Sequence, residues 1–220
     1  MVIRYRMSAR VIAVTTPVQE NWTAEDLIVY VARVSNPTTQ NTASSPERLI
    51  RYCVDNKHWS VFETVSVTIE IETTRAIASQ ILRHRSFTFQ EFSQRYAVVE
   101  TDPEPQRARS PHPRNRQASL DTLPDDVQTW WRDEQKKSYE ASSELYVRAL
   151  ERGIAKECAR FVLPLATPTK LYMTGNIRNW IHYVDMRSGN GTQKEHADIA
   201  DSIRDILAEM FPITASALGW

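Results

Sequence analysis

The sequence has little of what marks several common classes of protein. Only two of its 220 residues are cysteines, and the spacing of Cys53 and Cys158 fits neither a metal-ligand pair nor a redox pair. The 27 basic and 27 acidic residues cancel, whereas a protein that binds nucleic acid through charge usually has a basic excess. No apolar run approaches membrane-spanning length. Met1–Arg6 lacks the apolar core of a secretory signal. We therefore expect a cytoplasmic protein with neither a nucleic-acid nor a membrane partner.

Alternation of apolar and polar residues predicts a sheet. Between Val65 and Glu72, β-branched residues alternate with polar ones, which is typical of a strand with one buried and one wet face. Runs at 10–16 and 169–174 predict two further strands. Apolar residues at helical spacing, with capping residues before them, predict helices at 23–36, 45–56, 75–85, 124–152, 154–163, 176–187 and 197–211. These elements predict an α+β fold in which an antiparallel sheet packs against several helices within one domain, residues 1–220.

The periodic pattern breaks down in one place. Proline is frequent between residues 100 and 118, and neither a helical nor a strand period is present there. Because proline fixes φ and removes a backbone donor, this segment is predicted to be an irregular Pro-rich loop. It is either a disordered connection or a flexible cover over a binding site.

The densest group of polar residues lies between Ser79 and Tyr96. Arg83, His84 and Arg85 are expected near the last turn of a helix, where cations are in any case favoured by the helix dipole. Further along, Glu91, Ser93 and Arg95 alternate with other residues and are predicted to share one face of an extended segment. Arginine forks with a nearby hydroxyl suit a phosphate, so the stretch predicts an anion pocket.

Other residues have both an ordinary and a functional interpretation. His58, Ser60 and Glu63 are expected in a loop, and Arg160 lies among apolar residues, where a buried guanidinium needs an anionic partner. Both cysteines are expected on apolar helix faces as structural residues, since neither has an activating partner nearby in sequence. Trp130-Trp131 is interpreted as core or subunit interface.

The motif Arg83-His84-Arg85, seven residues and Ser93, flanked by Gln80 and Arg95, resembles the signature of the flavin-dependent thymidylate synthases. Shorter segments continue the resemblance from Arg33 to Glu195: Ala32-Arg33-Val34-Ser35, His58-x-Ser60-x-Phe62-Glu63, Ala159-Arg160-x-Val162-Leu163-Pro164-Leu165, and Gln193 with Glu195. The chain departs from the family pattern at Thr64 and at Ser188–Gly191, where a histidine is frequent.

The resemblance implies an enzyme that converts dUMP to dTMP, with FAD as cofactor and with NADPH and methylenetetrahydrofolate as co-substrates. It implies no metal, and it places the sites at subunit interfaces of a homotetramer. Arg187 is the implied catalytic residue, which polarises the pyrimidine. The implied FAD-binding residues are Ser60, Arg83, His84, Arg85, Glu91, Asn176, Arg178 and His182. The implied dUMP-binding residues are Gln80, Arg83, Glu91, Phe92, Ser93, Gln94, Arg95, Arg160 and Arg187.

Two alternatives stay open on the sequence alone. A related enzyme on the same scaffold could modify a pyrimidine nucleotide differently, for example by hydroxymethylation, as the altered Ser188–Gly191 segment suggests. A non-enzymatic RNA-binding module could instead use the arginines on phosphates and stack bases on Phe87, Phe89 and Phe92.

Overall fold

The computed structural model describes residues 7–40, 45–189 and 191–220. Two sequence-based interpretations therefore fall partly or wholly outside the described residues. They are the one drawn from Met1–Arg6 and, at residue 190, the one drawn from the Ser188–Gly191 segment.

A four-stranded sheet forms the centre of the fold. Its strands are β1 (Ser8–Val14), β2 (Ser66–Thr74), β6 (Pro168–Asn176) and β3 (Thr88–Glu91), in that order, and every neighbouring pair is antiparallel. β2 and β6 pair along their whole length, from Ser66 opposite Asn176 to Thr74 opposite Pro168. The predicted α+β class with an antiparallel sheet is confirmed, and the strand predicted at 169–174 is longer at both ends.

One face of the sheet is apolar and the other polar, as the alternation in β2 predicts. Glu70 on the polar face is nevertheless only 4% exposed, because side chains of both neighbouring strands cover it. Arg10 of β1 donates from Nε to its carboxylate at 2.6 Å, and Nζ of Lys170 on β6 lies 3.6 Å away. The hydrogen bond from Arg10 outweighs the cost of burial and lowers the pKa of Glu70 to about 2. Cross-strand ion pairs thus cover part of this face.

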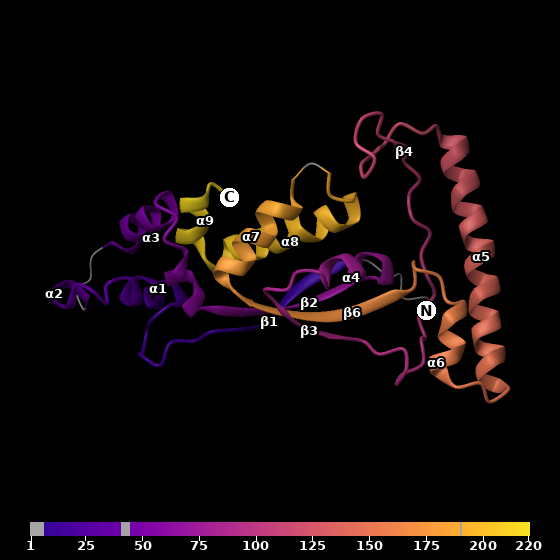
Figure 1. Cartoon of the computed structure of the whole chain (residues 1–220), viewed down its shortest axis with the longest axis horizontal. Helices are drawn as coiled ribbons and strands as arrows, with labels where there is room; N and C mark the ends of the chain where they lie inside the picture. Colours follow the sequence, from indigo (N-terminus) through magenta and orange to yellow (C-terminus); the bar gives the residue numbers. More distant parts are fainter. Residues whose placement is uncertain (1–6, 41–44, 190) are drawn as a thin grey trace.

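Three helices cover the apolar face of the sheet (Figure 1): α4 (Arg75–Ile81), α7 (Ile177–Arg187) and α8 (Lys194–Met210). Their inward side chains form the main core with the sheet, and Trp180 and Tyr183 of α7 are fully buried there. Asn176 accepts a hydrogen bond from the Asn179 N–H at 3.0 Å and so caps α7. Arg187 ends α7, as predicted.

The remaining helices of the first half lie together at one end of the sheet, with α9 from the C-terminus (Figure 1). Their bounds are α1 (Ala24–Ala32), α2 (Pro37–Gln40), α3 (Pro46–Asp55), the 3₁₀ helix η1 (Trp59–Thr64) and α9 (Pro212–Leu218). The loop predicted for His58, Ser60 and Glu63, over 57–63, is therefore wrong from Trp59 onward, since η1 begins there.

Of the predicted N-terminal caps of α1 and α3, only the cap of α1 forms a side-chain hydrogen bond to a backbone N–H of its helix. Thr23 and Asp26 form a capping box at the start of α1, which confirms Thr23 as its cap. Ser45 makes no such bond at α3, because its hydroxyl donates to the Glu47 side chain instead. Pro46 at the first position starts α3 without it.

α9, which the sequence pattern does not predict, is held from a distant part of the chain. The carboxylate of Glu25, which is 4% exposed, accepts the Thr214 N–H at 2.6 Å, the Thr214 hydroxyl at 2.7 Å and the Ile213 N–H at 3.2 Å. A carboxylate on the first N–H groups of a helix satisfies its free donors and opposes the positive end of its dipole. A residue of α1 therefore caps a helix 189 positions later.

A helical arm stands beside the sheet (Figure 1). It consists of α5 (Asp125–Glu151), α6 (Lys156–Ala159) and the 3₁₀ helix η2 (Arg160–Val162). Its small apolar cluster includes Tyr146, Ala149 and Ala159. Trp130 and Trp131 are 60% and 39% exposed, so the core alternative is wrong and the subunit-interface alternative stays a prediction. The helix predicted over 154–163 is shorter, and it consists of α6 followed directly by the 3₁₀ turn η2.

Residues 100–118 connect β3 to the arm and contain no helix. Their one short strand, β4 (Ser110–Pro111), pairs with β5 (Ser119–Leu120). Across the described parts of the chain, we find no helix that combines the length and apolarity needed to span a membrane.

Candidate functional site

The side chains that follow α4 alternate between exposed and buried positions. Ile77, Ala78 and Ile81 anchor α4 in the core. The chain then leaves the helix, and His84 points inward with 8% exposure while Arg83 and Arg85 on either side are exposed. The predicted Arg-His-Arg group therefore consists of one buried imidazole between two solvent-facing guanidinium groups.

His84 meets Arg187 from the end of α7. Arg187 Nε donates to His84 Nε2 at 2.8 Å, and the His84 ring lies edge-on to Tyr183 with 4.9 Å between ring centres. Burial, together with the nearby charges of Arg187 and His182, which act in the same direction, lowers the pKa of His84 to about 4. His84 is therefore neutral near pH 7, with Nε2 as acceptor and its proton on Nδ1. Two residues predicted for the site are thus in direct contact.

Gln80 joins the same group through α8. Its Nε2 donates to Gln193 Oε1 at 2.7 Å, and its Oε1 lies 3.2 Å from His196 Nδ1. His196 is completely buried, and its Nε2 lies 3.1 Å from the Tyr183 hydroxyl. The sequence did not indicate His196 as a site residue. A usable signal existed, because His196, Ile199 and Ile203 recur at the spacing of one buried helix face.

A second group of predicted residues lies where β3 ends. The Glu91 side chain is 17% exposed. Its Oε1 accepts hydrogen bonds from Arg75 Nη1 at 2.6 Å and from the Thr169 hydroxyl at 3.0 Å. The chain then turns, since the N–H groups of Tyr96 and Ala97 both donate to the Ser93 carbonyl. The predicted extended face of Glu91, Ser93 and Arg95 is therefore wrong, because ladder pairing with β6 stops and a local turn replaces it.

This turn carries an unusual buried amide. Gln94 is 7% exposed, and its Nε2 has no hydrogen-bond partner among the described residues. Leaving such a donor unpaired costs about 1–3 kcal/mol, so it is a natural point of contact for a bound molecule or a second chain. Arg95 pairs with Glu157 of α6 at 3.1 Å, and the half-buried Arg160 lies over the Phe161 ring at 5.8 Å.

A third group lies at the other end of β6. Ser60 on η1 is exposed, and Arg178 of α7 donates to Glu63 of η1. The side-chain oxygen of Asn176 accepts the hydrogen bond that caps α7. In the described part of the chain, no side-chain hydrogen bond or ion pair joins the three groups to one another. Hydrogen bonds therefore link Gln80 to α8 and His84 to Arg187 within one chain, and none of the described residues links Ser60 or Ser93 to them in this way.

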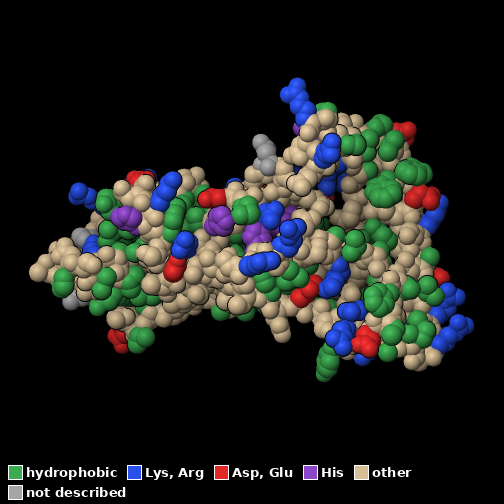
Figure 2. Space-filling model, viewed as in Figure 1, with side chains coloured by type: hydrophobic (Ala, Val, Ile, Leu, Met, Phe, Trp, Pro, Cys, Tyr) green, Lys and Arg blue, Asp and Glu red, His purple; other side chains and the backbone are tan. Residues whose placement is uncertain are grey.

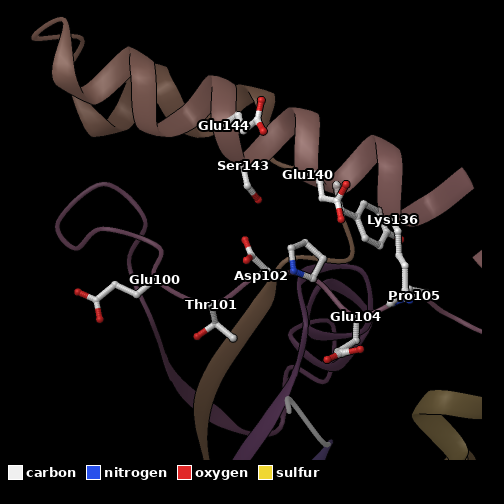
Figure 3. A pocket seen from close by; sticks show the side chains of 11 residues that line it. Glu100, Thr101, Asp102, Glu104, Pro105, Lys136, Glu140, Ser143 and Glu144 are labelled. Atoms are coloured by element: carbon white, nitrogen blue, oxygen red, sulfur yellow. The ribbon is translucent and has the colours of Figure 1, made fainter. Parts of the chain in front are cut away.

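Basic and histidine side chains gather near the middle of the face shown in Figure 2. A hollow lies away from these side chains, between residues 100–105 and α5 (Figure 3), and has a volume of about 680 Å³. Its walls carry five carboxylates and one ammonium group: Glu100, Asp102, Glu104, Glu140, Glu144 and Lys136. Such a charge balance repels a phosphate. The arginine and histidine residues around α4 are therefore the better candidate for an anionic ligand.

Comparison with known proteins agrees with this geometry. The family model described as "Thymidylate synthase complementing protein" (Thy1) matches residues 18–213. A probable flavin-dependent thymidylate synthase of Paramecium bursaria Chlorella virus 1 is 57% identical over 215 residues, which cover 97% of this chain and 100% of the relative. The chain belongs to the flavin-dependent thymidylate synthase family. A flavin-dependent thymidylate synthase of Synechocystis is 48% identical over 218 residues, which cover 97% of this chain and 100% of that relative.

A solved structure extends the family likeness to the fold. The UMP/dUMP methylase PolB of Streptomyces cacaoi, bound with 5-Br dUMP, superposes with a TM-score of 0.84 at 26% identity, covering 100% of this chain and 97% of that one. The resemblance seen in the Arg83–Ser93 motif is thus confirmed over nearly the whole chain. The family membership makes this chain a flavin-dependent thymidylate synthase.

Two features bear on other interpretations of the same residues. Phe87 is 7% exposed and packs edge-on to Trp180, so it cannot stack on an RNA base, whereas Phe92 is 37% exposed. Cys53 is buried, and burial raises the pKa of its thiol, which disfavours the nucleophilic thiolate. Cys158 is exposed, contrary to its predicted place on an apolar helix face.

Proposed function

We propose that the chain converts dUMP to dTMP, using FAD reduced by NADPH, and methylenetetrahydrofolate as the carbon donor. The proposal rests most on the contact between Arg187 and His84. A neutral imidazole holds the Arg187 guanidinium from Nε, so the direction of the side chain is set while its charge is kept. Among the described residues, no carboxylate forms an ion pair with Arg187.

That arrangement suits electrostatic catalysis. The terminal nitrogens of Arg187 stay available to donate to an oxygen on which negative charge develops, such as a carbonyl of the uracil ring. A fixed donor of this kind stabilises the charged form without reorganising during the reaction. A carboxylate partner in place of His84 would cancel much of the positive charge.

The residues around Arg187 fit an anionic cofactor. Arg83 and Arg85 are exposed donors, and the neutral imidazole of His84 carries a proton on Nδ1. Guanidinium pairs match the geometry of a pyrophosphate. We assign FAD binding to Ser60, Arg83, His84, Arg85, Glu91, Asn176, Arg178 and His182. A bound flavin supplies the reduction that no side chain can perform.

The nucleotide is assigned to the turn after β3 and to the Arg187 group. The members are Gln80, Arg83, Glu91, Phe92, Ser93, Gln94, Arg95, Arg160 and Arg187. The buried amide nitrogen of Gln94, which has no hydrogen-bond partner among the described residues, supports a ligand at this turn. Ser93 acts as a binding hydroxyl rather than a nucleophile, since among the described residues no base is hydrogen-bonded to its side chain.

We further propose that complete sites form between subunits of a homotetramer. Ser60 and Ser93 belong to groups that no side-chain hydrogen bond or ion pair among the described residues joins to Arg187. Phe161 and Leu165 are 81% and 72% exposed, and such exposed large apolar side chains suit burial by another chain. Light scattering at working concentration tests this part alone.

The chemical proposal is tested by the visible absorption spectrum of the purified protein, with and without dUMP, and by turnover. We expect bound flavin, a spectral change on addition of dUMP, and a product heavier than dUMP by one CH₂ unit, because a methyl group replaces the hydrogen at C5. A hydroxymethyl product would show the related pyrimidine-modifying enzyme instead. A protein that neither retains nor takes up flavin would contradict the proposal.

The variant Arg187→Ala separates charge stabilisation from cofactor binding. We expect flavin content close to that of the unchanged protein and a loss of turnover of about 10²-fold or more, as for removal of a fixed oxyanion donor. Arg187→Lys is the matched control, because it keeps the charge but cannot keep the Nε bond to His84. Loss of flavin in Arg187→Ala would show that Arg187 is a cofactor or structural residue.

A further inference from the structure

A chain of hydrogen bonds runs from the Pro-rich loop into the core beside the proposed site. Arg109 of the loop pairs with Glu195 Oε1 at 2.5 Å, with exposures of 15% and 12%. Glu195 Oε2 accepts Gln193 Nε2 at 3.0 Å, and Gln193 Oε1 accepts Gln80 Nε2 at 2.7 Å. The chain continues from Gln80 Oε1 to His196 Nδ1 and from His196 Nε2 to the Tyr183 hydroxyl.

The carboxylate at one end fixes the direction of every bond. Burial alone would raise the pKa of Glu195, but hydrogen bonds from Arg109, its own backbone N–H and Gln193 outweigh burial and lower it. Glu195 is therefore ionised near pH 7 and can only accept. Gln193 must turn its NH₂ toward Glu195, which leaves its carbonyl oxygen facing Gln80.

The same constraint passes along the chain one residue at a time. Because Gln193 offers an oxygen, Gln80 must offer its NH₂ there and its oxygen to His196. An oxygen facing Nδ1 requires the proton of His196 on Nδ1. Nε2 is then unprotonated and accepts the Tyr183 hydroxyl.

His196 and Tyr183, at the buried end of the chain, have the protonation states that these bond directions require. Burial lowers the pKa of His196 to about 3 and raises that of Tyr183, so a neutral ring and a protonated phenol meet. Every hydrogen bond in the chain then joins a donor to an acceptor, and a reversal at any one residue would place two acceptors face to face.

We infer that His196 is a positioning residue that holds the side-chain amide of Gln80 in one orientation. The inference rests on the proposed function, in which Gln80 contacts the nucleotide. His196 touches no ligand itself, since it is fully buried behind Gln80. When Gln80 is bonded to both Gln193 and His196, it keeps one N–H and one lone pair in fixed positions for a ligand. Without these two bonds the amide can rotate or flip, and nucleotide binding then includes the free-energy cost of ordering it.

The first test does not depend on activity. Long-range proton–nitrogen NMR of imidazole nitrogens identifies the tautomer of each histidine, and His196→Asn assigns the signals. We expect the Nδ1–H tautomer for His196, unchanged between about pH 8 and pH 5. The Nε2–H tautomer would overturn the inference, whatever the protein catalyses.

The second test measures binding of dUMP. In His196→Leu, which removes both hydrogen bonds, we expect the KM for dUMP to rise about tenfold, equivalent to ~1.4 kcal/mol, with kcat within about twofold and flavin content unchanged. His196→Asn keeps a donor near the Nδ1 position and should recover KM to within about threefold of the unchanged protein.

Ile203→Val on the same buried face of α8 is the matched control for loss of packing. It should lower the melting temperature while leaving the KM for dUMP unchanged. An unchanged KM in His196→Leu, or a parallel loss of flavin and kcat, would overturn the positioning role while leaving the proposed function intact. If the unchanged protein neither binds flavin nor makes dTMP, the proposed function fails, and the tautomer alone decides how His196 is bonded.

Discussion

Acid should destabilise this protein well above the pH at which ordinary carboxyl groups titrate. Two buried imidazoles, those of His84 and His196, have pKa values of about 4 and about 3, below the ordinary value of 6.5. As the pH falls through 6.5, the unfolded chain takes up protons at both residues before the folded chain does. A folded-state pKa below the unfolded one gives stability that is fully present above pH 6.5 and is lost as the pH falls toward the folded values.

The magnitude follows from these values. Between about pH 8 and pH 5 an unfolded histidine becomes almost fully protonated, while the buried ones remain almost fully neutral. At ~1.4 kcal/mol per pH unit, each histidine then lowers the free energy of unfolding by about 2 kcal/mol, and the two together by about 4 kcal/mol. That is a large fraction of the ~5–15 kcal/mol typical of a domain.

Urea unfolding followed by tryptophan fluorescence, at several pH values in that range and at constant salt and protein concentration, measures the effect. His196→Asn supplies the control, because it removes one of the two titrating groups. We expect the variant to lose only about 2 kcal/mol over the interval in which the unchanged protein loses about 4 kcal/mol. A stability that stays flat between these pH values, or a variant with the full slope, would refute the reasoning.

Three further substitutions test the packing and the site. Gly175→Ala should lower the free energy of unfolding by about 1–3 kcal/mol in urea melts, because its Cβ would lie 2.5 Å from ring carbons of Phe87; Phe87→Leu in the same chain should recover part of the loss, and no recovery would locate the strain elsewhere. Glu25→Ala, which uncaps the start of α9, should cost about 2–4 kcal/mol, and a cost below ~0.5 kcal/mol would show that water replaces the carboxylate. Ser93→Ala should keep measurable dTMP formation with weaker dUMP binding, whereas complete loss of turnover with intact binding would identify a nucleophile.

The local elements with strong periodicity were predictable from the sequence. β2 alternates cleanly, and the Thr23 cap and the end of α7 at Arg187 follow local rules that need no distant partner. The elements that sequence reasoning placed wrongly are short or set by neighbours. The turn after Glu91 begins where the pairing of β3 with β6 stops, which a single strand pattern does not show. η1 is a short 3₁₀ helix that packs against α1 and α7.

The candidate site divides in the same way. The Arg83–Ser93 motif pointed to an anionic ligand because guanidinium groups and hydroxyls suit phosphate whatever surrounds them. The sequence could not show that Arg187 rests on His84, or that His196 stands behind Gln80, since these contacts join residues more than 100 positions apart.

By itself, the sequence determined the kinds of chemical group in this protein and the local segments that carry them. Only the tertiary structure decided which groups are charged, which are neutral and which bond to one another. Burial sets the protonation of His84 and His196, and contact between α4, α7 and α8 sets their partners. The reason is physical: a pKa and a hydrogen bond depend on solvent exposure and on neighbours in space, and both exist only once the helices have packed on the sheet.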